Sequence, residues 1–138
     1  MEVAVGRAFE RALSALGGRP LVALTGAGLS TDSGIPDYRG PGAPRRTPMT
    51  YQQLLSGPAA QRRYWARSFV GWARMDRARP NAGHRALAEL ERTGGLRGLI
   101  TQNVDGLHTA AGSRAVIDLH GRIADVVCVG CRRRSPRA

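Results

Sequence analysis

The sequence predicts an α/β fold, namely a partial Rossmann-like parallel sheet with flanking helices and, after it, the start of a small metal-binding module. Three short apolar runs, at 21–24, 97–101 and 115–119, lie between glycine, proline or polar residues, as the buried strands of a parallel sheet do. Segments with helical spacing of apolar residues separate these runs, and such alternation is typical of a parallel sheet. Cys128 and Cys131 follow the last run and mark the module.

The elements follow from breakers and periodicity. Residues 2–16 carry apolar side chains at near-helical spacing, and Gly17-Gly18 ends that helix. Residues 34–50 hold six prolines or glycines after Gly34, so we expect a long loop. The helical elements expected beyond it are a short helix and a longer one over 51–75, split at Gly57-Pro58, then a helix over 82–93 with Asn81 as N-cap, and a short helix after 102–106.

Composition restricts the class of protein. The 138 residues suit one domain or part of one, and no apolar run approaches the ~18 residues of a membrane span. The net charge of +11 comes from 21 basic residues that are all arginine and are spread along the chain. Nucleic-acid binding needs a clustered basic footprint and is therefore not favoured. The N-terminus lacks the order of a secretory signal, so we expect a cytoplasmic protein with no membrane partner.

A glycine turn follows the first predicted strand. Gly26-Ala27-Gly28 supplies the first two glycines of G-x-G-x-x-G, and such a turn can bring backbone N–H groups to a phosphate pair. The third glycine is displaced to Gly34, and no acidic residue stands ~20 positions later, where the dinucleotide fingerprint needs one. An ordinary dehydrogenase is therefore disfavoured.

Polar residues follow the predicted strands at their carboxyl ends, where open α/β sheets bind ligands. Asn103 and Asp105 follow the second strand, and His120 follows the third. A histidine with an ordinary pKa near 6.5 is a competent base at neutral pH, although lone histidines are more often structural. We interpret His84 and His108, on predicted helices, as structural caps or packing groups.

The cysteine pair suits a metal half-site or a redox pair. No strand–helix start surrounds it as a thioredoxin-like motif requires, so metal is favoured. A zinc site takes four ligands, and the chain offers two thiolates.

Four motifs together resemble those of the sirtuins, which are NAD-dependent protein deacylases. They are the segment from Gly26 to Arg39, the segment Thr101-Gln-Asn-Val-Asp-Gly-Leu-His108, Leu119-His120-Gly121, and the pair Cys128-x-x-Cys131. The resemblance implies removal of acyl groups from lysine in a protein or peptide, with transfer of the acyl group to ADP-ribose and release of nicotinamide. Tyr38 and the stretch 62–75 are most similar to the class II, mitochondrial lipoamidase-type branch.

The resemblance also implies residue roles. His120 would be the general base, with Asn103 and Asp105 beside it in catalysis, and Cys128 and Cys131 would bind zinc. The residues implied to bind NAD are Gly26, Ala27, Gly28, Ser30, Thr31, Asp37, Tyr38, Arg39, Gln102, Asn103, Asp105 and His120. Tyr64 and Arg67 have the Tyr-x-x-Arg spacing with which desuccinylase-like sirtuins bind a carboxylated acyl group, although an exposed helix face is an equal alternative.

By this resemblance the chain is the N-terminal portion of a catalytic domain. Residues 1–50 and 97–121 would form the NAD-binding part, 51–93 a helical part and 122–138 an incomplete zinc module, since the second cysteine pair is missing. We therefore expect low or no activity from the isolated chain. Alternatives are an NAD-dependent mono-ADP-ribosyltransferase, a non-catalytic NAD-binding remnant, and a zinc-linked dimer that binds nucleic acid through 132–137.

Overall fold

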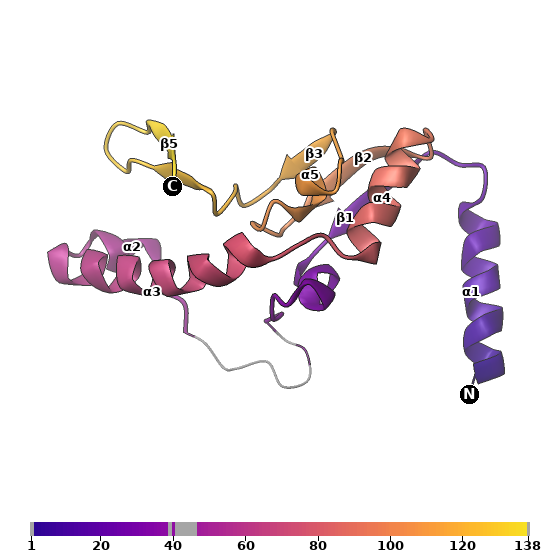
Figure 1. The fold of residues 1–138 in the computed structure, drawn as a ribbon, viewed down its shortest axis with the longest axis horizontal. Helices are drawn as coiled ribbons and strands as arrows, with labels where there is room; N and C mark the ends of the chain where they lie inside the picture. Colours follow the sequence, from indigo (N-terminus) through magenta and orange to yellow (C-terminus); the bar gives the residue numbers. More distant parts are fainter. Residues whose placement is uncertain (1, 39, 41–46, 138) are drawn as a thin grey trace.

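The computed structural model of the chain describes residues 2–38, 40 and 47–137, and it leaves the side chains of 2–5 undescribed (Figure 1). Its centre is a three-stranded parallel sheet in the order β1-β2-β3, made of β1 (Leu21–Thr25), β2 (Leu96–Thr101) and β3 (Val116–Asp118). Thr25 pairs with Thr101, and Thr101 pairs with Asp118, so the three strands finish level with one another. The predicted parallel sheet is confirmed.

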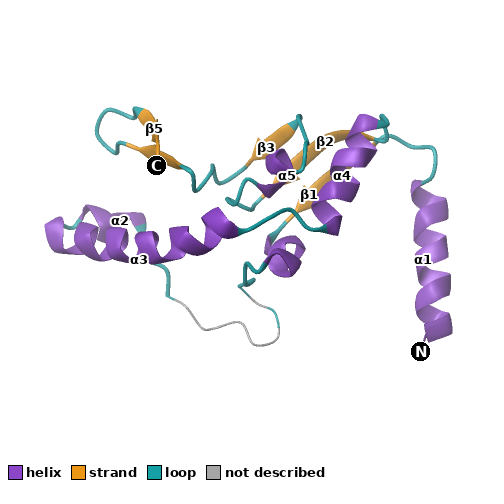
Figure 2. Cartoon of the chain, in the orientation of Figure 1, coloured by secondary structure: helices purple, strands orange, loops and turns teal. Residues whose placement is uncertain are grey.

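The connections between the strands carry the helices (Figure 2). Between β1 and β2 lie the 3-10 helix η1 (Ala27–Ser33), α2 (Tyr51–Leu55), α3 (Pro58–Arg77) and α4 (Ala82–Arg92), and between β2 and β3 lies α5 (Leu107–Ala110). The predicted break at Gly57-Pro58 is confirmed, because Gly57 has a φ of 141° and Pro58 occupies the first turn of α3. No sequence signal had indicated η1.

One face of the sheet carries the core. Helix α4 packs on β2 and on α5, and Leu99 of β2 is fully buried there. The other face is uncovered: Val22 is 65% exposed, Leu24 66% and Ile117 56%. The expectation that the first and third strands are buried is therefore wrong for this face, because within the described residues no helix covers it.

The C-terminal segment forms an antiparallel hairpin of β4 (Asp125–Val127) and β5 (Arg134–Pro136), which the sequence did not predict. Its end is fixed to α3. The Arg137 guanidinium lies 5.7 Å from the Trp65 ring centroid and 5.4 Å from that of Trp72, and it donates to Ser68 Oγ and to the Ile123 carbonyl. Cation–π contacts and hydrogen bonds thus hold the hairpin on α3.

The first helix, α1 (Glu2–Leu16), agrees with the prediction and ends at the Gly17-Gly18 break, where Gly18 has a φ of 72°. It stands apart from the sheet (Figure 1), and Phe9, Leu13 and Leu16 are exposed on it. Among the helices of the described residues, none combines the length and the apolarity that a bilayer crossing requires.

Candidate functional site

The glycine turn leads from β1 into η1 rather than into an ordinary crossover helix. Gly34 adopts the left-handed conformation, with φ 80°, and its N–H donates to the Ser30 and Thr31 carbonyls at the end of η1. A residue with a side chain is strained at that φ, so the displaced glycine of the fingerprint serves to end η1. The short helix places Ser30 directly beyond the carboxyl end of the sheet.

Ser30 is the centre of a buried polar cluster. Its side chain is fully buried, and its hydroxyl donates to Asp105 Oδ2 at 2.7 Å and accepts from Asn103 Nδ2 at 3.1 Å. Asn103 Nδ2 also donates to the Gly26 carbonyl at 3.0 Å, and Asp105 Oδ1 accepts from the Leu107 N–H at 2.9 Å. The structure therefore joins three predicted site residues, from η1 and from the segment after β2, in one network.

His84, on the first turn of α4, is the part of this cluster that sequence reasoning missed. Its Nδ1 accepts from the Asn81 backbone N–H at 3.3 Å, so the neutral ring carries its proton on Nε2, which lies 3.5 Å from Ser30 Oγ. The ring is fully buried, and burial lowers its pKa below the ordinary value, while the charge of Asp105 acts in the opposite direction. His84 is thus a neutral donor aimed at Ser30.

His108, on α5, extends the cluster to the strand ends. Its ring stacks edge-on against His84 with centroids 4.9 Å apart, and its Nε2 lies 2.9 Å from Thr25 Oγ1, which donates to Thr101 Oγ1. Burial lowers the pKa of His108, and the neighbouring His84 lowers it further. The expectation of a structural histidine holds for its burial, but both rings support the residues of the site.

Other predicted NAD-binding residues are placed less tightly. The Thr31 hydroxyl donates to the Gly28 carbonyl, and Asp37 Oδ1 accepts from the Gly40 N–H at 3.0 Å. Tyr38 is 78% exposed, and Arg39 lies outside the described residues. Gln102 is exposed beside the Gly26 turn, and a Cβ placed on Gly26 would come within 3.9 Å of Gln102 Oε1.

His120 lies apart from the Ser30 cluster, beyond β3. Its Nδ1 lies 2.9 Å from the Gln102 carbonyl, which can only accept, so Nδ1 carries a proton and Nε2 is free on an exposed ring. A cavity of about 440 Å³ opens beside it, and its lining includes Tyr64 of α3 and Arg137. Of the predicted Tyr64-Arg67 pair, which is three residues apart on α3, Tyr64 lines this cavity, whereas Arg67 is exposed and is not part of its lining.

Cys128 and Cys131 lie at the hairpin turn, and both are free and exposed. Backbone N–H groups of Cys131 and Gly130 point at the Cys128 sulfur and lower the pKa of its thiol, which favours the thiolate that a metal binds. In the described part of the chain no group of three or more His, Cys, Asp or Glu side chains could hold a metal ion. Two thiolates separated by two residues are the donor type of half a tetrahedral zinc site.

Comparison with known proteins identifies the family. The profile of the Sir2 family matches residues 26–137, which include the glycine turn, the Ser30 cluster, His120 and both cysteines. The chain belongs to the Sir2 family.

The curated relatives of this Sir2 chain are named as NAD-dependent protein deacetylases. The "NAD-dependent protein deacetylase 1" of Mycobacterium avium (strain 104) is 60% identical over 135 residues, which are 97% of this chain and 48% of that relative. The protein of the same name from Streptomyces coelicolor is also 60% identical, over 85% of this chain and 40% of that relative. The chain thus spans about half the length of the curated relatives it matches.

Solved structures agree with the fold of this Sir2 chain. "Sir2-p53 peptide-NAD+" superposes with a TM-score of 0.75 at 39% identity, over 91% of this chain and 51% of that one. A Sir2 complex with an inhibitor, 2'-O-acetyl-ADP-ribose and a deacetylated p53 peptide gives a TM-score of 0.77 at 35% identity, over 92% and 51%. The predicted α/β class and its helices are confirmed.

A signal for His84 was present in the Sir2 sequence. Asn81 caps α4, and three residues later His84 returns a bond to the cap backbone, as the fourth residue of a capping box does. The interpretation of His84 as a structural cap is confirmed by this bond, although glutamate or glutamine is the usual partner at that place in a capping box. The same bond that completes the cap turns Nε2 toward Ser30.

Proposed function

We propose that this protein is an NAD-dependent protein-lysine deacylase that transfers the acyl group to ADP-ribose and releases nicotinamide. One observation carries the proposal: in a Sir2 family chain, the Ser30–Asn103–Asp105 network lies at the adjoining ends of β1 and β2. Ligands of open α/β sheets bind at that edge. The names of the relatives and the NAD and peptide in a matching structure support the same activity.

The residues around the glycine turn fit a dinucleotide. Among the described residues, no acceptor takes the N–H groups of Ala27 and Gly28 at the start of η1, and no atom stands within 4 Å of a Cβ placed on Gly28. These groups would meet the phosphates, with Ser30, Thr31 and Gln102 along the sugar-phosphate chain. Asp37, Tyr38 and Arg39 would close over the nicotinamide end. NAD, when bound, supplies an electrophilic ribose carbon.

His120 is the residue proposed to act as the general base. Because its Nδ1 donates to the Gln102 carbonyl, its Nε2 lone pair is available to take a proton from a ribose hydroxyl. Asn103 and Asp105 would hold the ribose that presents this hydroxyl. The buried His84–Ser30 contact fixes the rotamer of Ser30 and through it the Asp105 carboxylate.

The finer assignments are also proposals. We infer a class II, lipoamidase-type acyl preference in which acidic or bulky acyl groups are removed faster than acetyl, with Tyr64 lining the acyl entrance and Arg67 at its outer side. Acetyl-lysine turnover equal to or faster than succinyl- or glutaryl-lysine turnover contradicts it. Cys128 and Cys131 supply two zinc ligands, and a cytoplasmic location stays part of the proposal.

The test combines binding and turnover. Calorimetry with NAD on the purified chain is expected to show one site, and Asp105→Asn is expected to weaken it because the Ser30 and Leu107 bonds to the carboxylate change. In a deacylation assay, any turnover that the chain shows is expected to be abolished by His120→Ala, while NAD still binds. Labelled ADP-ribose that appears on protein instead of on an acyl group indicates a mono-ADP-ribosyltransferase. Absence of both binding and turnover rejects the proposed activity for this chain.

A further inference from the structure

The cavity beside His120 is rich in positive charge. Its lining includes Arg122, Arg134 and Arg137, and Asp125 is the one acidic side chain in it. Among the described residues, the only ion pair joins Arg92 to Glu89 on α4, so none of these three arginines is ion-paired with a carboxylate. An uncompensated cluster of this kind in a concave site attracts anions.

The three arginines are not equivalent. Arg137 is fixed: its guanidinium lies over Trp65 and Trp72 and donates to Ile123 and Ser68. Arg122 and Arg134 are exposed, and in the described part of the chain their side chains donate to no protein acceptor. The Arg122 guanidinium rests against the backbone of Gly106, 3.3 Å from the place where a Cβ would stand. Two free guanidinium groups are therefore available at the rim.

The position of the free arginines indicates what they contact. A group that reaches His120 enters the cavity, and the exposed guanidinium groups of Arg122 and Arg134 in its lining give it an edge that is open to solvent. Side chains on either side of an inserted lysine remain at that edge, because successive side chains of an extended peptide point to opposite sides and outward. A guanidinium fork matches a carboxylate better than any other peptide side chain.

We propose that Arg122 and Arg134 select acidic residues that flank the acylated lysine in the peptide substrate. This inference rests on the proposed function and adds a sequence preference to it. Val104, Ile123 and Val127 also line the cavity and offer apolar surface to the aliphatic parts of the substrate. The arginines thus provide charge at the rim, and the acyl-lysine occupies the space beside His120.

The experiment measures binding of labelled acetyl-lysine peptides to the chain by fluorescence polarisation, with and without NAD. One peptide has glutamate on both sides of the acetyl-lysine, and a second has glutamine at the same places. We expect the glutamate peptide to bind about fivefold more tightly at low salt, the range that two partly exposed ion pairs support. At about 1 M salt, where the Debye length is ~3 Å, the difference is expected to vanish.

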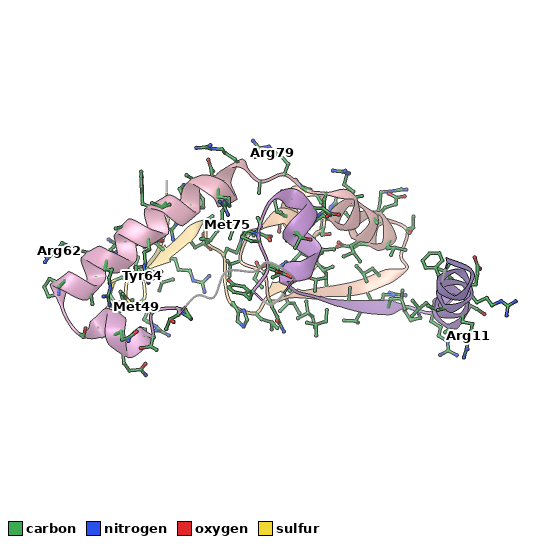
Figure 3. All side chains as sticks on the ribbon, turned by 90° about the horizontal axis from the view of Figure 1, so that it is seen from below. Arg11, Met49, Arg62, Tyr64, Met75 and Arg79 are labelled. Atoms are coloured by element: carbon green, nitrogen blue, oxygen red, sulfur yellow. The ribbon has the colours of Figure 1, made fainter. Side chains whose placement is uncertain are left out.

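Matched variants separate this preference from the overall positive charge. The double variant Arg122→Gln/Arg134→Gln is expected to bind both peptides equally. Arg11→Gln/Arg62→Gln removes the same charge from α1 and from the first turns of α3 (Figure 3). Neither of these two arginines lines the cavity, so this variant is expected to keep the preference. Circular dichroism confirms that each variant is folded.

Four outcomes overturn the inference: equal binding of the two peptides, a preference that survives Arg122→Gln/Arg134→Gln, a preference lost equally in both double variants, and binding of neither peptide. A preference for succinyl-lysine without any effect of the flanking glutamates overturns it too, because the carboxylate is then recognised on the acyl group. NAD calorimetry tests the proposed function separately. A chain that binds NAD but shows no flanking preference refutes only the inference.

Discussion

Asn81 couples the stability of α4 to the geometry of the site. Its side-chain oxygen accepts from the N–H groups of Gly83 at 2.9 Å and His84 at 3.3 Å, which caps the helix. Its amide nitrogen donates to the Leu29 carbonyl of η1 at 2.7 Å, and so it also joins two elements that are 52 positions apart in sequence. Replacement of Asn81 by alanine removes both functions.

The expected loss follows from the two functions. Removal of an N-cap side chain costs about 1 kcal/mol, and removal of one hydrogen bond that leaves a part-buried carbonyl unpaired costs about 1 kcal/mol more. We therefore expect Asn81→Ala to lower the free energy of unfolding by about 2 kcal/mol and Tm by about 6–10 °C. Asn81→Asp keeps the cap acceptor but cannot donate to Leu29, so we expect it to lose only about 1 kcal/mol.

Urea denaturation followed by circular dichroism measures these differences. Thr50→Ala is the matched control, since Thr50 caps the exposed helix α2 with the same kind of capping box but touches no part of the site. It is expected to cost less than 1 kcal/mol and to leave NAD binding unchanged, whereas Asn81→Ala also weakens NAD binding because His84 and η1 are no longer held together. Equal losses for Asn81→Ala and Thr50→Ala, or an Asn81→Asp variant as unstable as Asn81→Ala, would refute the coupling.

Three further predictions follow from single features of the structure. Gly106 has a φ of 71°, so Gly106→Ala is expected to lower the free energy of unfolding by about 1–2 kcal/mol. Gly6→Ala, in the solvated helix α1, is expected to raise the helix content instead. Denaturation midpoints that shift by the same amount for both variants contradict this. Burial lowers the pKa values of His84 and His108, so the unfolded chain takes up protons before the folded chain as the pH falls. The free energy of unfolding is therefore expected to be highest above about pH 6.5 and to decline toward about pH 5. Histidine titration by NMR and urea denaturation at about pH 7 and about pH 5 check this, and equal stability at the two pH values counts against it. Arg137→Ala is expected to release the hairpin from α3 and shift tryptophan emission to longer wavelength, while Arg132→Ala at the hairpin turn leaves the emission as it is.

Much of the fold could be predicted because the signals are local. Glycine and proline marked where α1 ends and where α2 and α3 separate, and Asn81 marked the start of α4. The 3-10 helix η1 was missed because glycine-rich segments have no periodicity before they meet their neighbours. The β4–β5 hairpin was missed because its three-residue strands are too short to show alternation.

The site was predicted in part, for a similar reason. Asn103 and Asp105 were found through their place after a strand and Ser30 through the family motif alone, and the structure joins the three by hydrogen bonds of 2.7 and 3.1 Å. His84 and His108 were interpreted as structural caps or packing groups, which the capping box of α4 confirms for His84, but a sequence does not show that two buried rings meet each other and the site. The Tyr64-Arg67 pair stays a prediction: Tyr64 lines the cavity, and Arg67 is exposed outside its lining.

By itself, the sequence determined the order of the three parallel strands and of the α-helices between them, and the polar groups that follow these strands, because breakers, caps and hydrophobic periodicity act between near neighbours. Tertiary structure alone decided that β1, β2 and β3 finish level, that His84 approaches Ser30 across 54 positions of sequence, and that Arg122 and Arg134 share a cavity with His120. Those contacts depend on how α4 and the hairpin pack, and packing joins residues whose separation in the sequence carries no signal.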